Sequence, residues 1–312
     1  MDQRIERTFT VTAFLSRTGM LVLFLLVPVL SVQGEETPDL RTVTPDLVVP
    51  KMETGAPAPG KRVRQVLPKY RETAVYHALY LPTDWQEGKP YPVVVEYAGN
   101  GPFRSRYGDA STGHVEGSKM GYGMTAGQGF IWLCLPYLNE AGTKNVTRWW
   151  GDAPTYKPDA TLAYCQQAVP WVCQQYGGDE KMVILAGFSR GAIACNYLGL
   201  HNDQVATLWR AFIPYSHYDG VREGWPFPGV KRPAALERLQ RLQGRPQFIC
   251  HENKTLDAAA LKATQQYLQG TGVQGNFTFQ TTGFRNHNDA WLLRPSPARV
   301  ALRKWLQEVN DR

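Results

Sequence analysis

A serine stands between two glycines where an apolar run meets a run of small residues. The segment reads Gly187-Phe188-Ser189-Arg190-Gly191, with the apolar run 182–186 before it and the small-residue run 192–200 after it. A strand that turns this sharply into a helix leaves no room for a Cβ atom at either glycine. The serine hydroxyl would then stand above the sheet, beside a helix N-terminus that favours developing negative charge. The pattern predicts a nucleophilic serine on a strand–turn–helix elbow. The alternative, a plain glycine turn, requires that no suitable acid and histidine follow.

The chain after residue 70 alternates strand-like apolar runs with helical runs. This order is typical of a mostly parallel sheet with helices on both faces. A length of 312 residues, 43% of them hydrophobic, suits one large core. We therefore predict a single three-layer α/β domain, with loop over 99–129. The expected strands are 73–81, 91–98, 130–138, 182–186, 211–216, 246–250 and 277–281, and the expected helices are 159–175, 192–200, 204–210, 234–242, 257–268 and 297–309.

Residues 1–34 have the pattern of an export signal. Three arginines precede the apolar run 20–30, and the small-residue pattern 32–34 would allow cleavage before Glu35. The apolar run is short for a membrane span. We predict a cleaved signal peptide and an exported protein, secreted or periplasmic, with no other span. The alternative is an uncleaved N-terminal membrane anchor.

Residues 35–69 are expected to form a proline-rich linker or extended arm, and residues 70–312 the catalytic domain. The net charge of +7 is scattered along the chain. Its densest group, Arg62, Arg64, Lys69 and Arg71, fits a solvated lead-in better than a nucleic-acid site. We therefore expect no nucleic-acid partner.

The five cysteines do not suggest a disulfide framework. Cys134 and Cys250 fall in expected strands, and Cys195 falls in the helix after the elbow. Cys165 and Cys173 share one helix, where eight residues rise about 12 Å, too far for a bond between them. We expect buried thiols that act as small apolar residues. A bridge between two different elements is left open.

A histidine follows the last expected strand and precedes the last helix. His287 is placed where it could take the proton of Ser189 during attack and return it to the leaving group. The alternative is an ordinary histidine on a surface loop.

Three carboxylates are candidates for the acid that orients this histidine. Asp257, between the penultimate strand and its helix, is preferred, although it could instead be the N-cap of that helix. Glu252 follows the same strand directly and has the longer side chain. Asp219, on the loop after 211–216, is the third candidate.

Two backbone N–H groups are needed to stabilise an oxyanion. One is expected from Arg190, directly after the serine. The other is expected from Gly101 or Asn100 on the loop after 91–98, because Pro102 has no N–H to donate. The alternative is that this loop is a turn without a catalytic role.

Aromatic residues follow two of the expected strands on the side of the elbow. Trp149 and Trp150 lie on one such loop, and Trp225 and Phe227 lie on another. They are candidates for an apolar or sugar-stacking wall of a substrate site, with Trp149, Trp150 and Trp225 as the main contacts. Packing within the loops is the alternative.

Two further histidines, His217 and His251, stand at strand ends near Asp219 and Glu252. These four residues have no local metal-ligand spacing, so no metal is expected.

The elbow, the Gly99-Asn100-Gly101 loop and His287 together make the chain resemble the α/β-hydrolase superfamily. Within it, the chain is most similar to exported esterases of the polyhydroxybutyrate-depolymerase and feruloyl or acetylxylan esterase kind. The resemblance covers roughly residues 70–310 in element order. It implies a triad of Ser189, His287 and one of the acids. A His-Gly-x-x-Asp segment is usual at the acid, whereas this chain has His251-Glu252-Asn253.

The resemblance implies a serine hydrolase that cleaves a small-molecule or polymeric carboxylic ester through an acyl-enzyme, without a cofactor. The alternatives are a serine peptidase of the same fold and a non-catalytic binding protein with the same cleft. The natural ester and the oligomeric state are left open.

Overall fold

The computed structural model of this chain describes residues 37–253 and 258–311. The expected signal peptide or anchor, 1–34, and the candidate acid Asp257 lie outside these residues. Residues from Thr37 onward belong to one compact unit. None of the helices described in it has the length and apolar character needed to cross a bilayer.

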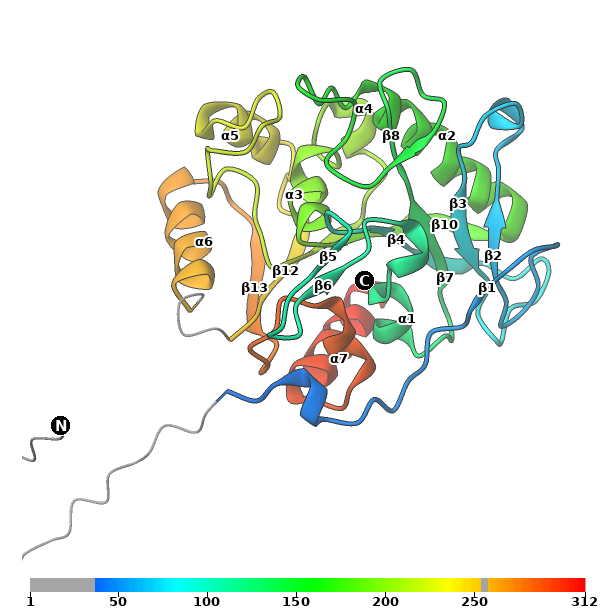
Figure 1. Ribbon diagram of the computed structural model, residues 1–312, viewed down its shortest axis with the longest axis horizontal. Helices are drawn as coiled ribbons and strands as arrows, with labels where there is room; N and C mark the ends of the chain where they lie inside the picture. The colour runs from blue at the N-terminus through cyan, green and yellow to red at the C-terminus, as the bar shows by residue number, and fades with distance from the viewer. Residues whose placement is uncertain (1–36, 254–257, 312) are drawn as a thin grey trace, which may run out of the picture. The chain divides into compact units, whose positions relative to one another are not determined.

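A nine-stranded sheet forms the centre of this unit (Figure 1). The strand order is β1-β2-β3-β7-β4-β10-β11-β12-β13. β3 runs antiparallel to both of its neighbours, and the other pairs are parallel. The bounds are β1 Met52–Glu53, β2 Arg62–Gln65, β3 His77–Tyr80, β4 Tyr91–Tyr97, β7 Ile131–Leu135, β10 Gly178–Phe188, β11 Ala211–Tyr215, β12 Pro246–His251 and β13 Asn276–Thr281.

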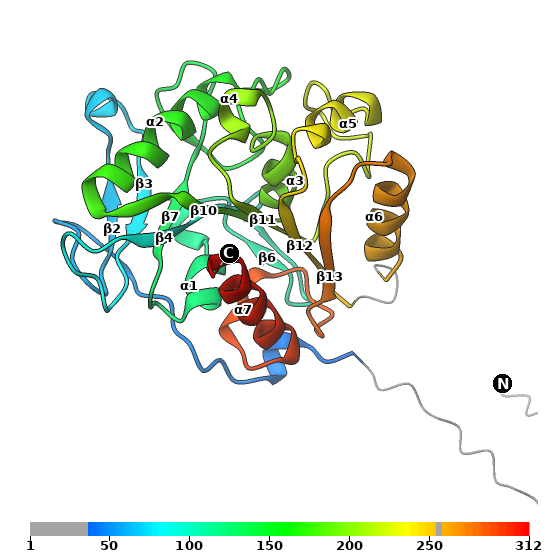
Figure 2. The ribbon, with the colours of Figure 1, turned by 180° about the vertical axis from the view of Figure 1, so that it is seen from behind.

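Helices cover both faces of the sheet (Figure 2). On one face lie α2 Asp159–Tyr176, α3 Arg190–Tyr197, α4 Asp203–Ala206, α5 Arg232–Gln240 and α6 Ala258–Thr271. On the other lie α1 Met120–Thr125 and α7 Pro297–Asn310. Successive side chains of β4 enter opposite cores, with Val93 and Val95 in one and Val94 in the other. The predicted three-layer α/β fold is confirmed.

The catalytic domain was expected to begin at residue 70, but part of the preceding arm belongs to it. β1 and β2 belong to the central sheet, and β2 pairs antiparallel with β3. Arg62, expected to be solvated, is buried. Its guanidinium donates to Val115 O and Glu116 O and lies 4.4 Å from the centre of the Trp132 ring. Carbonyl acceptors and an aromatic face therefore accommodate a charge that the sequence pattern assigns to solvent.

The expected loop over 99–129 contains a helix, α1, as well as a small hairpin of β5 Phe103–Arg104 and β6 Ala110–Ser111. The sequence does not predict α1 because it contains glycines at 121 and 123, and glycine has a low helix propensity. Glu96 stabilises its N-terminus: the carboxylate accepts the N–H groups of Met120 and Gly121.

The five cysteines are all buried and free. This confirms the expectation of buried apolar thiols. Burial raises the pKa of each thiol, so the thiols stay protonated.

Candidate active site

Ser189 occupies the turn between β10 and α3, as the sequence predicts. Its φ of +55° is unusual for a residue with a side chain. A Cβ at Gly191 would overlap Tyr97 O of the neighbouring strand, and a Cβ at Gly187 would overlap the Gly191 backbone. The elbow therefore requires both glycines, and it exposes the Ser189 side chain to a surface cavity.

His287 lies on the loop that follows β13, and its Nε2 is 3.0 Å from Ser189 Oγ. The backbone of this loop is held by the hairpin: His287 N donates to Asp109 Oδ1 at 2.8 Å, and Ala110 N donates to His287 O at 3.2 Å. The imidazole also packs against the ring of Phe188, with centroids 4.7 Å apart. Both its position and its orientation are thus fixed by neighbours.

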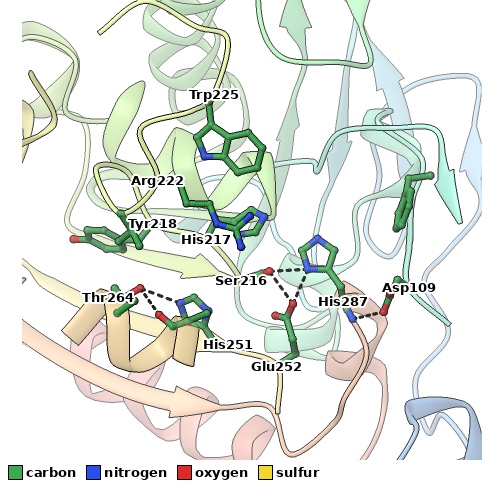
Figure 3. A pocket seen from close by; sticks show the side chains of 14 residues that line it. Asp109, Ser216, His217, Tyr218, Arg222, Trp225, His251, Glu252, Thr264 and His287 are labelled. Carbon is green, nitrogen blue, oxygen red and sulfur yellow. Dashed lines mark hydrogen bonds and ion pairs between the residues drawn. The ribbon is translucent and has the colours of Figure 1, made fainter. Parts of the chain in front are cut away.

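Glu252, the second-ranked acid in the sequence, contacts the imidazole ring of His287. Its Oε1 lies 2.8 Å from His287 Nδ1 (Figure 3). Burial alone would raise the pKa of Glu252, but hydrogen bonding and charge from His287 outweigh burial and lower it to about 2. Asp219 is occupied elsewhere, since Arg238 binds both of its oxygens at 2.8 and 3.1 Å.

Ser216 is a site residue that the sequence analysis missed. Its Oγ lies 2.7 Å from His287 Nδ1 and 3.2 Å from Glu252 Oε1. It directly follows β11, with a φ of +89°. Its place at the carboxyl end of a strand beside the elbow strand was the available signal, because such ends meet at one edge of the sheet.

The first expected oxyanion donor, the backbone N–H of Arg190, lies directly after Ser189 at the start of α3. Arg190 is the first residue of α3, so its backbone N–H has no acceptor within the helix. The second assignment needs a correction. Gly101 N–H donates to Thr147 O at 2.9 Å, which leaves Asn100 as the remaining candidate of the two. The Asn100 side chain accepts the N–H of Trp149 at 2.7 Å and so joins two loops of the site.

The side chain of Arg190 has a further role that the sequence analysis did not consider. Its guanidinium is fully buried and lies 3.6 Å from the centre of the Tyr137 ring. It donates to the carbonyl oxygens of Gly99 at 3.0 Å, of Gly113 at 3.4 Å and of Trp149. Burial lowers its pKa to about 10. One side chain on the elbow thereby holds three loops around Ser189.

Two cavities adjoin the Ser189–His287 pair. One, of about 380 Å³, is lined by Ser189, His287, Asn100 and Trp149 among others. The second, of about 530 Å³, is the pocket drawn in Figure 3 and is lined by His287 and Trp225 among others. Its other polar side chains include His217, Arg222, His251 and Thr264.

The three tryptophans expected at the substrate wall have different positions. Trp149 and Trp225 are half-buried, each lines one of the two cavities, and their rings are 5.2 Å apart. Trp150 was wrongly assigned. It is 0% exposed and stacks on Tyr197 with ring centres 4.5 Å apart, so it belongs to the core.

His217 and His251 both line the cavity beside His287. Burial lowers the pKa of His217 to about 3 and that of His251 to about 4. Across residues 37–253 and 258–311, no group of three or more His, Cys, Asp or Glu side chains is arranged to hold a metal ion.

No model of a known protein family matches the chain. No curated protein sequence matches it either. Several solved structures share its fold. An acetyl ester-xyloside bifunctional hydrolase from Caldicellulosiruptor lactoaceticus has a TM-score of 0.53 and 15% identity, over 82% of this chain and 99% of that one. Thermogutta terrifontis esterase 2 phosphorylated by paraoxon has a TM-score of 0.51 and 15% identity, over 80% and 93%.

A third similar structure is dipeptidyl peptidase 4 of Porphyromonas gingivalis, with a TM-score of 0.50 and 14% identity. The match covers 81% of this chain but only 36% of that protein. Together with the sheet order and the two helical layers, these similarities show that the chain has the α/β-hydrolase fold.

Proposed function

We propose that this α/β-hydrolase-fold chain is a serine hydrolase that cleaves carboxylic esters through an acyl-enzyme. The observation that carries the proposal is one continuous series of contacts. Ser189 Oγ is 3.0 Å from His287 Nε2, and His287 Nδ1 is 2.8 Å from Glu252 Oε1. These are the distances at which a base can take a proton from a nucleophile while a carboxylate orients it.

In the proposed reaction, Ser189 Oγ attacks the ester carbonyl while its proton passes to His287 Nε2. Glu252 holds Nδ1–H and stabilises the imidazolium that forms. The oxyanion accepts hydrogen bonds from the backbone N–H of Arg190 and, on this proposal, of Asn100. His287 then protonates the leaving alcohol. In the second half of the reaction, water attacks the acyl carbonyl and gives a proton to His287. The Ser189 oxygen then leaves and takes that proton back.

An ester substrate is favoured over a peptide by the names of the proteins that share the fold. Two that match this chain over 93% and 99% of their own length are an esterase and an acetyl ester-xyloside bifunctional hydrolase. The peptidase has most of its length outside the match. The aromatic pair Trp149–Trp225 beside the two cavities would contact the acyl or alcohol group. The pattern at 1–34 supports action outside the cytoplasm.

Hydrolysis of short-chain p-nitrophenyl esters tests this proposal. We expect the wild type to be active and Ser189→Ala to lose nearly all activity, at least about a thousandfold. Ser296→Ala is a matched control, because Ser296 caps α7 away from the site. It should keep the rate and lose only some stability. Equal rates for wild type and Ser189→Ala would overturn the proposal, and cleavage of p-nitroanilide peptides but not esters would favour the peptidase.

A further inference from the structure

The loop that carries His287 is bound on one side by a segment from the opposite end of the chain. This segment, residues 38–47, was expected to be part of a linker. It instead packs beside α7, as the blue end of the ribbon in Figure 1 shows. Leu40 in it is 2% exposed and belongs to the same core as Trp291 and Leu302.

We propose that Asp39, in this N-terminal segment, is a positioning residue that fixes the His287 loop for catalysis. The inference rests on the proposed function. It assigns a role in the active site to a residue 248 positions away from His287 in the sequence.

The Asp39 side chain is only 6% exposed and makes direct contact with the two residues before His287. Its Oδ2 accepts from Arg285 Nη2 at 2.9 Å, and its Oδ1 accepts from Asn286 Nδ2 at 3.2 Å. The backbone adds two bonds: Leu40 N donates to Asn286 Oδ1 at 2.7 Å, and Arg285 N donates to Pro38 O at 3.1 Å. Four hydrogen bonds thus join the segment to residues 285 and 286.

The hairpin of β5 and β6 holds the same loop from another direction. Asn286 Nδ2 also donates to Tyr107 O at 2.6 Å, and Arg41 Nη1 donates to Arg106 O at 3.1 Å. The N-terminal segment, the hairpin and the His287 loop therefore form one connected network with Asp39 at its centre. The hydrogen bond from Arg41 is the main cause that lowers the pKa of Asp39, which keeps the carboxylate ionised.

This network bears on catalysis because the His287 loop lies beyond the end of β13. A base must stay within hydrogen-bond reach of its nucleophile, and an error of about 1 Å can lower a rate on the order of a hundredfold. In Asp39→Asn one of the two acceptor oxygens becomes an NH2 group, so Arg285 or Asn286 loses its acceptor on this side of the loop and the negative charge that pairs with Arg285 is removed. The loop then samples positions in which His287 Nε2 no longer reaches Ser189 Oγ.

The same segment contains a matched control. Asp46 also pairs with an arginine: its two oxygens accept from Arg299 on α7 at 2.6 and 2.5 Å. This pair ties the segment to α7 rather than to residues 285–287. Asp46→Asn should therefore loosen the segment as Asp39→Asn does, without removing a contact to the His287 loop.

The test compares Asp39→Asn and Asp46→Asn, each made in the full-length chain. It measures kcat and KM with p-nitrophenyl acetate and Tm by thermal unfolding. We expect Asp39→Asn to lower kcat about tenfold to a hundredfold, with KM within about twofold of wild type. Asp46→Asn should lower Tm but keep kcat. A wild-type kcat in Asp39→Asn, or equal losses of kcat in both variants, would overturn the inference.

Hydrogen–deuterium exchange separates this inference from the proposed function, because it does not require a substrate. Peptides covering 284–289 should exchange faster in Asp39→Asn than in Asp46→Asn. If the wild type hydrolyses no ester, the proposed function fails, and the exchange result alone decides whether Asp39 fixes the loop. Equal exchange over 284–289 in both variants would show that it does not.

Discussion

Glu252 contacts the ring nitrogen of His287 that faces away from Ser189. The Oε1–Nδ1 distance is 2.8 Å, while Nε2 on the other side of the ring is 3.0 Å from the serine hydroxyl. This arrangement selects the tautomer with its proton on Nδ1, which leaves Nε2 free to accept the serine proton. Ser216 Oγ lies close to both partners and reinforces the same orientation.

Glu252→Gln should therefore lower kcat strongly, by about a hundredfold to ten-thousandfold, because an amide can donate to Nδ1 and favour the wrong tautomer. Steady-state hydrolysis of p-nitrophenyl esters measures the effect. Asp257→Asn, the variant that the sequence ranks first, is the comparison and should lose far less. A loss confined to Asp257→Asn would contradict the assignment of Glu252.

The acid stability of the fold should depend on the same carboxylate. The pKa of Glu252 is lowered from 4.5 to about 2 in the folded protein. A lowered carboxyl pKa contributes stability that is present above the unfolded value and is lost as the pH falls through the folded value. The loss belongs to the window from about pH 4.5 to about pH 2 and amounts to at most about 3 kcal/mol. Urea unfolding across this window should give a shallower pH dependence for Glu252→Gln, and identical slopes would contradict the coupling.

Trp150 and Trp225 should respond differently to truncation. Trp150→Ala removes a fully buried ring that stacks on Tyr197, so we expect a loss of about 3–5 kcal/mol in the free energy of unfolding. Trp225→Ala should change stability little and raise KM for esters with bulky groups more than for acetate. Chemical denaturation and a series of esters measure the two effects. A larger stability loss for Trp225→Ala than for Trp150→Ala would contradict these placements.

The elbow and the histidine could be predicted because each depends on local sequence. Glycines at 187 and 191 are required by a sharp turn, and the position of His287 after the last strand follows from element order. The acid could not be fixed in this way. Glu252 and Asp257 follow the same strand, and the choice depends on how its loop meets the His287 loop in space.

Other errors have the same origin in tertiary contacts. Trp149 and Trp150 are adjacent in sequence, yet Trp149 lines a cavity and Trp150 belongs to the core. The backbone at Trp149 has a φ of +48°, which the sequence pattern does not indicate. Arg62 and Asp39 carry charges that the pattern assigns to solvent. Arg62 binds Val115 O, and Asp39 binds Arg285 as well as its neighbour Arg41; no local spacing reveals the distant partners.

Arg190 gives a prediction about the loops around the nucleophile. A lysine at this position has one ammonium group and cannot reach the carbonyls of Gly99, Gly113 and Trp149 together. Arg190→Lys leaves buried acceptors unpaired, at a cost of about 1–3 kcal/mol, and releases the loop that contains the proposed Asn100 donor. We expect kcat to fall about tenfold to a hundredfold.

The matched control for this change is Arg238→Lys, which alters another buried guanidinium. Arg238 pairs with Asp219 and lies over Tyr197, so its contacts are away from the three loops. It should lower Tm while kcat stays near that of the wild type. Esterase kinetics and thermal unfolding of both variants separate the two effects. If Arg190→Lys lost no more activity than Arg238→Lys at a similar loss of Tm, the guanidinium of Arg190 would contribute to stability and not to catalysis. A fall in kcat for Arg190→Lys but not for Arg238→Lys would instead show that Arg190 holds the loop of the proposed Asn100 donor in place.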